Sequence, residues 1–80
     1  MRIPLRIIVF PEGDRQEIPH TLRFNQLVDI NGNPIPLPLA TTKMIAYRVF
    51  RITSESTRNE DITEYHLEIV RPAELTEFVR

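Results

Sequence analysis

The fold is decided by two stretches, KMIAYRVFRITS (residues 43–54) and DITEYHLEIVR (residues 61–71), which we predict to pair as one long β-hairpin. Residues 62–71 alternate between apolar and polar side chains, the period of a strand that has one buried and one wet face. The buried face carries Tyr65, Leu67 and Ile69, and the wet face carries Glu64, His66 and Glu68. We expect the remaining strands to assemble around this hairpin.

The first arm of the hairpin breaks the alternation. Tyr47 and Val49 share one face, whereas Phe50 and Ile52 fall on the opposite face. One extra residue at Val49–Phe50, a β-bulge, would turn the apolar side chains of this arm inward together, and Ile45 with them. Apolar residues would then pair across the hairpin, with Phe50 opposite Tyr65, Tyr47 opposite Leu67 and Ile45 opposite Ile69. On the wet face, Arg51 would lie opposite Glu64.

Residues 2–10 predict another strand, whose second half is apolar on both sides. Its expected inner face carries Ile3, Leu5, Ile7 and Val9. Ile8 and Phe10 then fall on the outer face, and such a surplus indicates cover by another element or by a second chain. We expect the C-terminal segment to cover them, with a dimer contact as the alternative.

Two turn signals divide the next part of the chain. The sequence PEGD at residues 11–14 predicts a turn, because Pro presets φ and Gly admits positive φ. This turn would fold the first strand back into residues 15–24, which contain Pro19 and would therefore form an irregular strand or an edge strand. Asn31–Gly32 predicts a second, smaller hairpin, since both residues accept positive φ.

The outgoing arm of the smaller hairpin, residues 33–39, carries a proline at every second position. Proline has no amide hydrogen, so this arm would hydrogen-bond a neighbour only through Ile35, Leu37 and Leu39. We interpret it as an edge strand whose outer side is closed to further pairing. The alternative is a polyproline ligand segment, but the spacing Pro-x-x-Pro does not occur.

These elements predict a mainly β fold, one domain over residues 1–80. Five or six antiparallel strands would form a small barrel, similar in architecture to SH3-like and OB-type barrels. A short C-terminal helix beginning at Pro72 would bury Leu75, Phe78 and Val79. The main structural alternative is a helix over residues 41–53, but the β-branched and aromatic side chains there favour a strand. Folds of this kind host many unrelated functions.

Composition narrows the classes of function. Ten basic and eleven acidic residues give a net charge of −1 and are interspersed, so nothing demands a polyanionic partner. The chain has no cysteine, which permits a reducing compartment. Its unbroken apolar runs are too short for a signal sequence or a membrane span. We therefore expect a cytoplasmic protein without a membrane partner.

The residues that could carry chemistry are few. A zinc site needs three or four ligands, and the chain has two histidines and no cysteine. Its two glycines are far apart, so no phosphate-binding loop is expected. We predict no cofactor, no metal and no enzymatic activity. The alternative is a small enzyme that uses His66 with Glu64 or Glu68.

The remaining hypothesis is an interaction or assembly module that binds a protein or a second copy of itself. The candidate interaction residues are Ile8, Phe10, Arg6, Arg48 and Arg51. Single-stranded nucleic acid is an alternative ligand, because stacking on aromatic rings combined with arginine can suffice for binding. The residues concerned are Arg6, Arg23, Arg48 and Arg51 with Phe10, Phe24 and Tyr47. The negative net charge makes a nucleic-acid partner the less favoured prediction.

Overall fold

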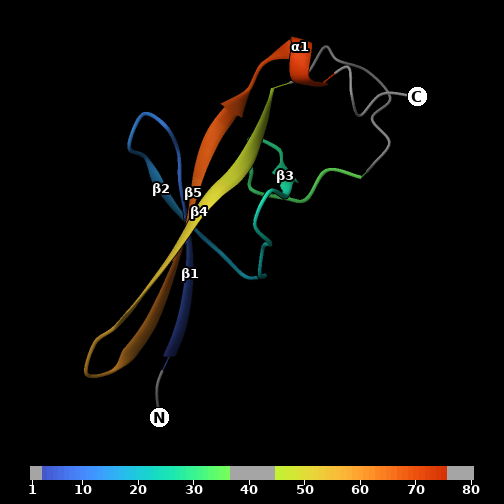
Figure 1. Cartoon of the computed structure of the whole chain (residues 1–80). Coiled ribbons are helices and arrows are strands. Elements are labelled where there is room, and N and C mark those ends of the chain that lie inside the picture. Colours follow the sequence, from blue (N-terminus) through green and yellow to red (C-terminus); the bar gives the residue numbers. More distant parts are fainter. Residues whose placement is uncertain (1–2, 37–44, 76–80) are drawn as a thin grey trace.

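The computed structural model describes residues 3–36 and 45–75, and its sheet is built on one long hairpin (Figure 1). β4 (Ala46–Ser56) and β5 (Glu60–Val70) pair antiparallel along their whole lengths. The amide of Thr57 donates to the carbonyl of Glu60 at 2.8 Å and closes the turn between them. The predicted hairpin is confirmed, and residues 46–53 form a strand and not a helix.

Three further strands complete a five-stranded sheet that curls into a half-barrel. β1 (Ile3–Val9) lies beside β5, β2 (Arg15–Ile18) lies outside β1, and β3 (Leu27–Val28) lies outside β4. The chain then forms the short helix α1 (Pro72–Leu75), at the end of the sheet away from the hairpin tip. The mainly β fold with five strands and a C-terminal helix is confirmed.

One strand pair runs against expectation. β1 pairs with β5 in parallel, with Ile3 beside Glu60 and Val9 beside His66. The sheet is therefore mixed, and the prediction that every pair would be antiparallel is wrong. A strand that is apolar on both faces suits a central position in the sheet, and β1 has such a position between β2 and β5.

The predicted bulge is present, but the predicted register is wrong by two residues. Val49 lies opposite Leu67 and Arg51 opposite His66, so Phe50 is the extra residue. Tyr47 therefore lies opposite Ile69, and not opposite Leu67. Because the extra residue of a bulge is left unpaired, Phe50 is exposed and does not join the core.

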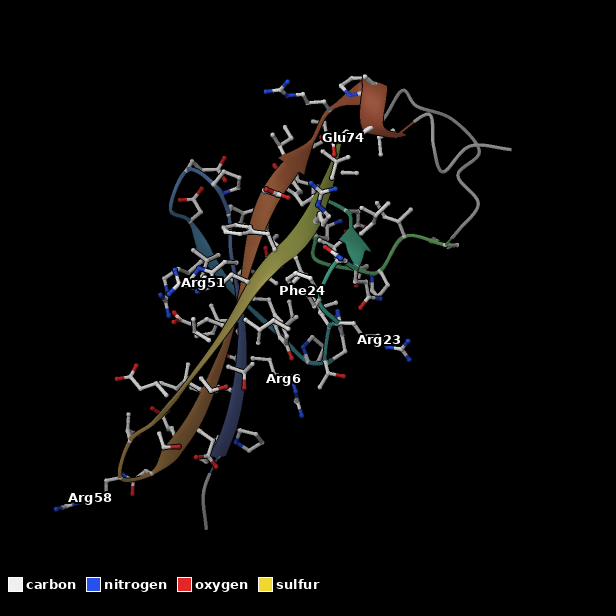
Figure 2. All side chains as sticks on the ribbon, in the orientation of Figure 1. Arg6, Arg23, Phe24, Arg51, Arg58 and Glu74 are labelled. Atoms are coloured by element: carbon white, nitrogen blue, oxygen red, sulfur yellow. The ribbon has the colours of Figure 1, made fainter. Side chains whose placement is uncertain are left out.

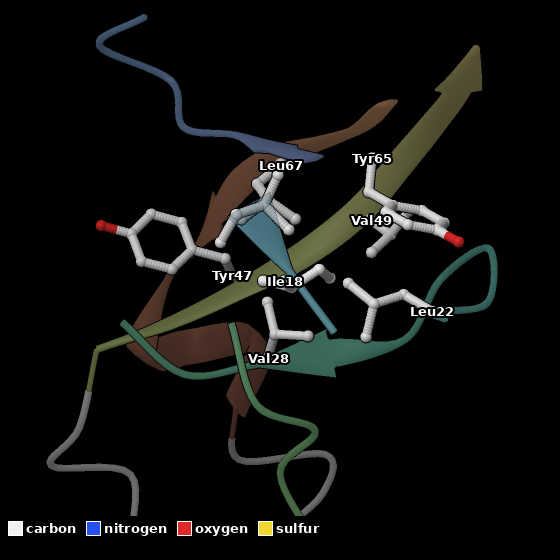
Figure 3. Close-up of a cluster of buried hydrophobic side chains, with 8 residues drawn as sticks. Ile18, Leu22, Val28, Tyr47, Val49, Tyr65 and Leu67 are labelled. Carbon is white, nitrogen blue, oxygen red and sulfur yellow. The ribbon is translucent and has the colours of Figure 1, made fainter. Parts of the chain in front are cut away.

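One face of the sheet carries the larger buried cluster (Figure 3). It consists of Ile8, Ile18, Leu22, Val28, Tyr47, Val49, Tyr65 and Leu67. Ile8 has no exposed surface, so the expectation that it would lie on the outer face is wrong. The parallel pairing places Ile8 beside Tyr65, and its cover comes from Leu22, between β2 and β3, and from the loop at Gly32, after β3.

A smaller cluster lies on the opposite face, because its strand residues alternate with those of the first. It contains Leu27, Ala46, Val70 and Leu75, and Ile35 packs against it. Leu75 of α1 therefore does not cover Ile8. The prediction that the C-terminal segment covers Ile8 is wrong. Phe78 and Val79, the other residues expected on the helix face, lie outside the described residues.

The first turn is as predicted, and the strand after it is shorter. The amide of Phe10 donates to the carbonyl of Asp14 at 2.8 Å, and Gly13 has a φ of +99°. β2 ends at Ile18, one residue before Pro19, and not at residue 24. Pro19 follows the last paired residue, Ile18, as expected for a proline at the end of an edge strand.

The second hairpin is also present, built on the side chain of Asp29. Its carboxylate accepts hydrogen bonds from the amides of Asn31 at 2.8 Å and Asn33 at 2.9 Å. Gly32 has a positive φ and Asn31 does not. The amide of Ile35 donates to the carbonyl of Leu27 at 3.0 Å, so the proline arm pairs through Ile35 as predicted. Leu37 and Leu39 lie outside the described residues.

Candidate functional site

Exposed isoleucines gather beside the α1 end of the sheet, on the face of the larger cluster. Ile30, Ile45 and Ile69 are 58%, 56% and 57% exposed. They adjoin Phe10, which is half-buried, and Tyr47, which is largely buried. We name the set Phe10, Ile30, Ile45, Tyr47 and Ile69 the isoleucine patch. Large exposed apolar patches mark sites of interaction on soluble proteins.

The bulge register brings the patch together around Tyr47. Ile69 is the cross-strand partner of Tyr47. Ile45 precedes Tyr47 by two residues and so projects to the same side. The ring of Phe10, which follows β1, meets the ring of Tyr47 edge to face with centroids 5.2 Å apart. In Figure 3 the Tyr47 ring points away from the rest of the buried cluster, with its hydroxyl outermost.

A shallow hollow of about 260 Å³ opens into the patch between Phe10, Ile30 and Tyr47. Its rim is formed by Glu12 and Asp14 of the turn between β1 and β2 and by Arg15 and Gln16 of β2. Arg15 forms an ion pair with Glu64, and the carboxylates of Glu12 and Asp14 form none with any residue of the described chain. The hollow therefore combines an apolar floor with an acidic border.

The five residues predicted from the sequence to form the interaction site do not lie together in the structure. Phe10 belongs to the isoleucine patch, whereas Ile8 is fully buried and has no surface to offer. Arg48 is occupied by ion pairs with Glu68 and Glu74. The other two, Arg6 on β1 and Arg51 on β4, do not lie beside the patch.

The arginines of the nucleic-acid hypothesis do not form one surface. Arg6 is the partner of Thr63 and Arg51 is the partner of His66. Because Thr63 and His66 are three residues apart on β5, Arg6 and Arg51 project to opposite faces of the sheet. Figure 2 shows Arg6 and Arg23 extending to one side and Arg51 to the other. The rings of Phe10 and Tyr47 meet each other edge to face.

His66 lies on the other face, in an open hollow of about 450 Å³ lined also by Arg51, Thr53 and Glu64. Its Nε2 is 3.0 Å from the hydroxyl of Thr53, which donates to Glu64 at 3.3 Å. His66 thus reaches Glu64 through Thr53. Glu68 turns instead to Arg48. In residues 3–36 and 45–75 no three His, Asp or Glu side chains are grouped to hold a metal ion.

Sequence reasoning missed the three isoleucines of the patch. Ile45 and Ile69 follow the alternation of buried strand residues, and only the register and the extent of the covering loops show that they are exposed. Ile30 precedes Asn31–Gly32, a pair that predicts a turn and gives no sign of how exposed Ile30 is. The one available signal was Phe10, at the apolar end of a strand that the pattern already marked as unusual.

Comparison with known proteins adds a family and no activity. None of the helices in the described part of the chain is long and apolar enough to span a membrane. No curated protein and no solved structure matches the chain. A family described as "Uncharacterised Treponema protein" matches residues 6–78, which include every element from the second half of β1 to α1. The chain belongs to this family of uncharacterised Treponema proteins.

Proposed function

We propose that the protein is a non-catalytic interaction module that binds a protein partner through the isoleucine patch. The observation that carries the proposal is the exposure of Ile30, Ile45 and Ile69, each above one half, around an aromatic pair on a rigid sheet. Because each of these side chains is a little over half exposed, covering it is worth about 1 kcal/mol. That gain is available only to a partner that covers them.

The acidic rim specifies the chemistry of the partner. Glu12 and Asp14 border the hollow beside Phe10 and Ile30, and the cation of the rim, Arg15, is already paired. A complementary surface therefore presents an apolar side chain flanked by Lys or Arg. Opposite charge at the border of an interface steers encounter and fixes orientation. The proposal includes no cofactor, and it places the protein in the cytoplasm, which the absence of cysteine permits.

Peptides of defined chemistry test this proposal. One set carries a central Leu or Phe flanked by Lys, and a matched set carries Glu in place of Lys. Titration of the full chain, followed by amide chemical shifts, is expected to show that the Lys-flanked set binds and shifts Ile30, Ile45 and Ile69. Binding of both sets alike, or shifts confined to other residues, would contradict the proposal.

A matched pair of variants makes the test specific. Ile69→Arg places a charge in the patch, and Ile3→Arg places the same charge on an isoleucine of similar exposure at the other end of the sheet. Loss of a central apolar contact costs about 2 kcal/mol, or roughly thirtyfold in affinity. Ile69→Arg is expected to show that loss and Ile3→Arg is not. Equal effects of the two substitutions would place the binding surface elsewhere.

A further inference from the structure

Over residues 51–56, no strand of residues 3–36 and 45–75 lies beside the outer edge of β4. β3 pairs with β4 only at Tyr47 and Arg48, and the loop before β3 bonds to Val49. From Arg51 to Ser56, β4 has β5 on one side and no strand of the described chain on the other. Figure 1 shows this part of the hairpin extending beyond β3.

The hydrogen-bond alternation tells which backbone groups point outward from this edge. The amide of Thr57 donates to the carbonyl of Glu60 across the turn. By the alternation of an antiparallel pair, the backbone groups that point toward β5 are those of Thr57, Glu55, Thr53 and Arg51. The amide and carbonyl groups of Ile52 and Ser54 therefore point away from the sheet. The hydrogen bond from the Ile3 amide to the Asn59 carbonyl supports this alternation. It shows that odd-numbered residues on the β5 arm point their backbone groups toward β1, so the even-numbered ones point toward β4.

At the other edges of the sheet a proline occupies an outward position. In β1, Pro4 lies beyond the end of β2 and on the side that faces it. On the β2 side, Pro19 follows Ile18, which turns inward to Arg6. In the arm outside β3, Ile35 bonds inward, so Pro34 and Pro36 face out. Proline blocks strand addition because it has no amide hydrogen. β4 has no proline, so its open edge is not blocked in this way, and neither are the outward groups of Arg15 and Glu17 in β2.

We propose that this edge pairs with the same edge of a second copy of the chain, antiparallel about a two-fold axis at Thr53. Ile52 would then exchange both backbone hydrogen bonds with Ser54 of the second copy, and the reverse. Strand addition of this kind is an established mode of recognition. Thr53 would lie opposite its own equivalent, a favourable cross-strand pair.

Charge selects this register and this partner. With Thr53 on the axis, Arg51 lies opposite Glu55 of the second copy, and the two-fold axis repeats the pair. Arg51 and Glu55 make no ion pair within the described chain, and their Cα atoms are about 13 Å apart along the strand. Shifting the axis to Ser54 would place Arg51 opposite Thr57 and lose both ion pairs. The isoleucine patch takes no part in this contact.

Sedimentation of the full chain tests the proposal through one backbone group. Ser54→Pro removes the outward amide and leaves the bonds to β5 intact, and Ser54→Ala is the matched control that keeps the amide. We expect concentration-dependent dimers for the native chain at about 1 mM, the same for Ser54→Ala, and at least about tenfold weaker association for Ser54→Pro. A native chain that stays monomeric, or a Ser54→Pro chain that associates normally, overturns the proposal.

A charge exchange tests the register without touching the backbone. Arg51→Glu and Glu55→Arg are each expected to weaken self-association about tenfold, because each puts like charges at both ends of the contact. Mixing the two variants, or combining them in one chain, restores opposite charges and is expected to restore dimers. Failure of both restorations overturns the register. Ile69→Arg is expected to dimerise normally, which separates this result from the fate of the peptide-binding proposal.

Discussion

Arg48 on β4 donates two hydrogen bonds to a single carboxylate oxygen of Glu68, its cross-strand partner on β5, from Nε at 2.8 Å and from Nη2 at 2.5 Å. Its Nη1 donates to Glu74 of α1 at 3.1 Å. One guanidinium thus joins both strands of the hairpin to the helix that covers the smaller cluster. The hydrogen bond to Glu68 is the main cause that raises the pKa of Arg48, and burial opposes it.

Arg48→Met is expected to lower the free energy of unfolding by about 1 kcal/mol. The estimate is modest because both partners are partly exposed and solvent screens the pairs. A guanidinium whose pKa is raised by folding contributes its full stability below the unfolded pKa and loses it only as pH rises through the folded pKa. Both pH 6 and pH 9 lie about three or more units below the unfolded pKa. The contribution of Arg48 to the free energy of unfolding should therefore be the same at these two pH values.

Urea unfolding at these two pH values measures the effect. Arg23→Met is the control, since the side chain of Arg23 is exposed and forms no ion pair with described residues; it should change stability by less than about 0.5 kcal/mol. Equal losses in the two variants would show that Arg48 does not join α1 to the sheet.

Gly32→Ala is expected to destabilise the fold by about 2 to 4 kcal/mol, more than Gly13→Ala, at about 1 kcal/mol. Both glycines have positive φ, at +83° and +99°. A Cβ at Gly32 would lie 2.7 Å from Cδ1 of Ile8 and 3.2 Å from Cγ2 of Ile18, whereas none would lie within 4 Å at Gly13. The difference between the two midpoints of urea unfolding therefore isolates the close approach of the loop to Ile8. Identical midpoints would argue against that approach.

Leu67→Ala is expected to cost about 2 to 5 kcal/mol, and Ile69→Ala less than about 1 kcal/mol. The two residues share a face of β5, but Leu67 is 2% exposed and Ile69 is 57% exposed. Thermal unfolding should show a fall in Tm of about 8 °C or more for the first and a few degrees for the second. A comparable fall for both would mean that Ile69 is buried and that the isoleucine patch does not exist.

The hairpin was predictable because its signal is local. The alternation of residues 62–71 requires a strand in any context, and the break at Val49–Phe50 requires a bulge if both arms are to pair. The register was not predictable by matching apolar with apolar. That rule assumes that each apolar residue is buried. In the structure, Ile45, Phe50 and Ile69 are exposed.

The parallel pairing of β1 and the cover of Ile8 depend on contacts distant in sequence. Residues 7–10 are apolar on both sides, which leaves open which side meets the larger cluster. The loops around Leu22 and Gly32 decide it by packing against Ile8 and Ile18, and neither loop has a periodic pattern. The candidate site was predictable only in part, for the same reason. The sequence pointed to Phe10 because it ends an apolar strand. Ile30 and its neighbours form a surface only through tertiary packing, which no local pattern reports.

The bulge register is the central claim, because both the isoleucine patch and the outward amides of β4 depend on it. Nuclear Overhauser contacts between the two arms of the hairpin measure it directly in the full chain. The account predicts contacts between Tyr47 and Ile69 on one side of the bulge and between Ile52 and Tyr65 on the other. Contacts that join Tyr47 to Leu67 and Phe50 to Tyr65 would contradict it.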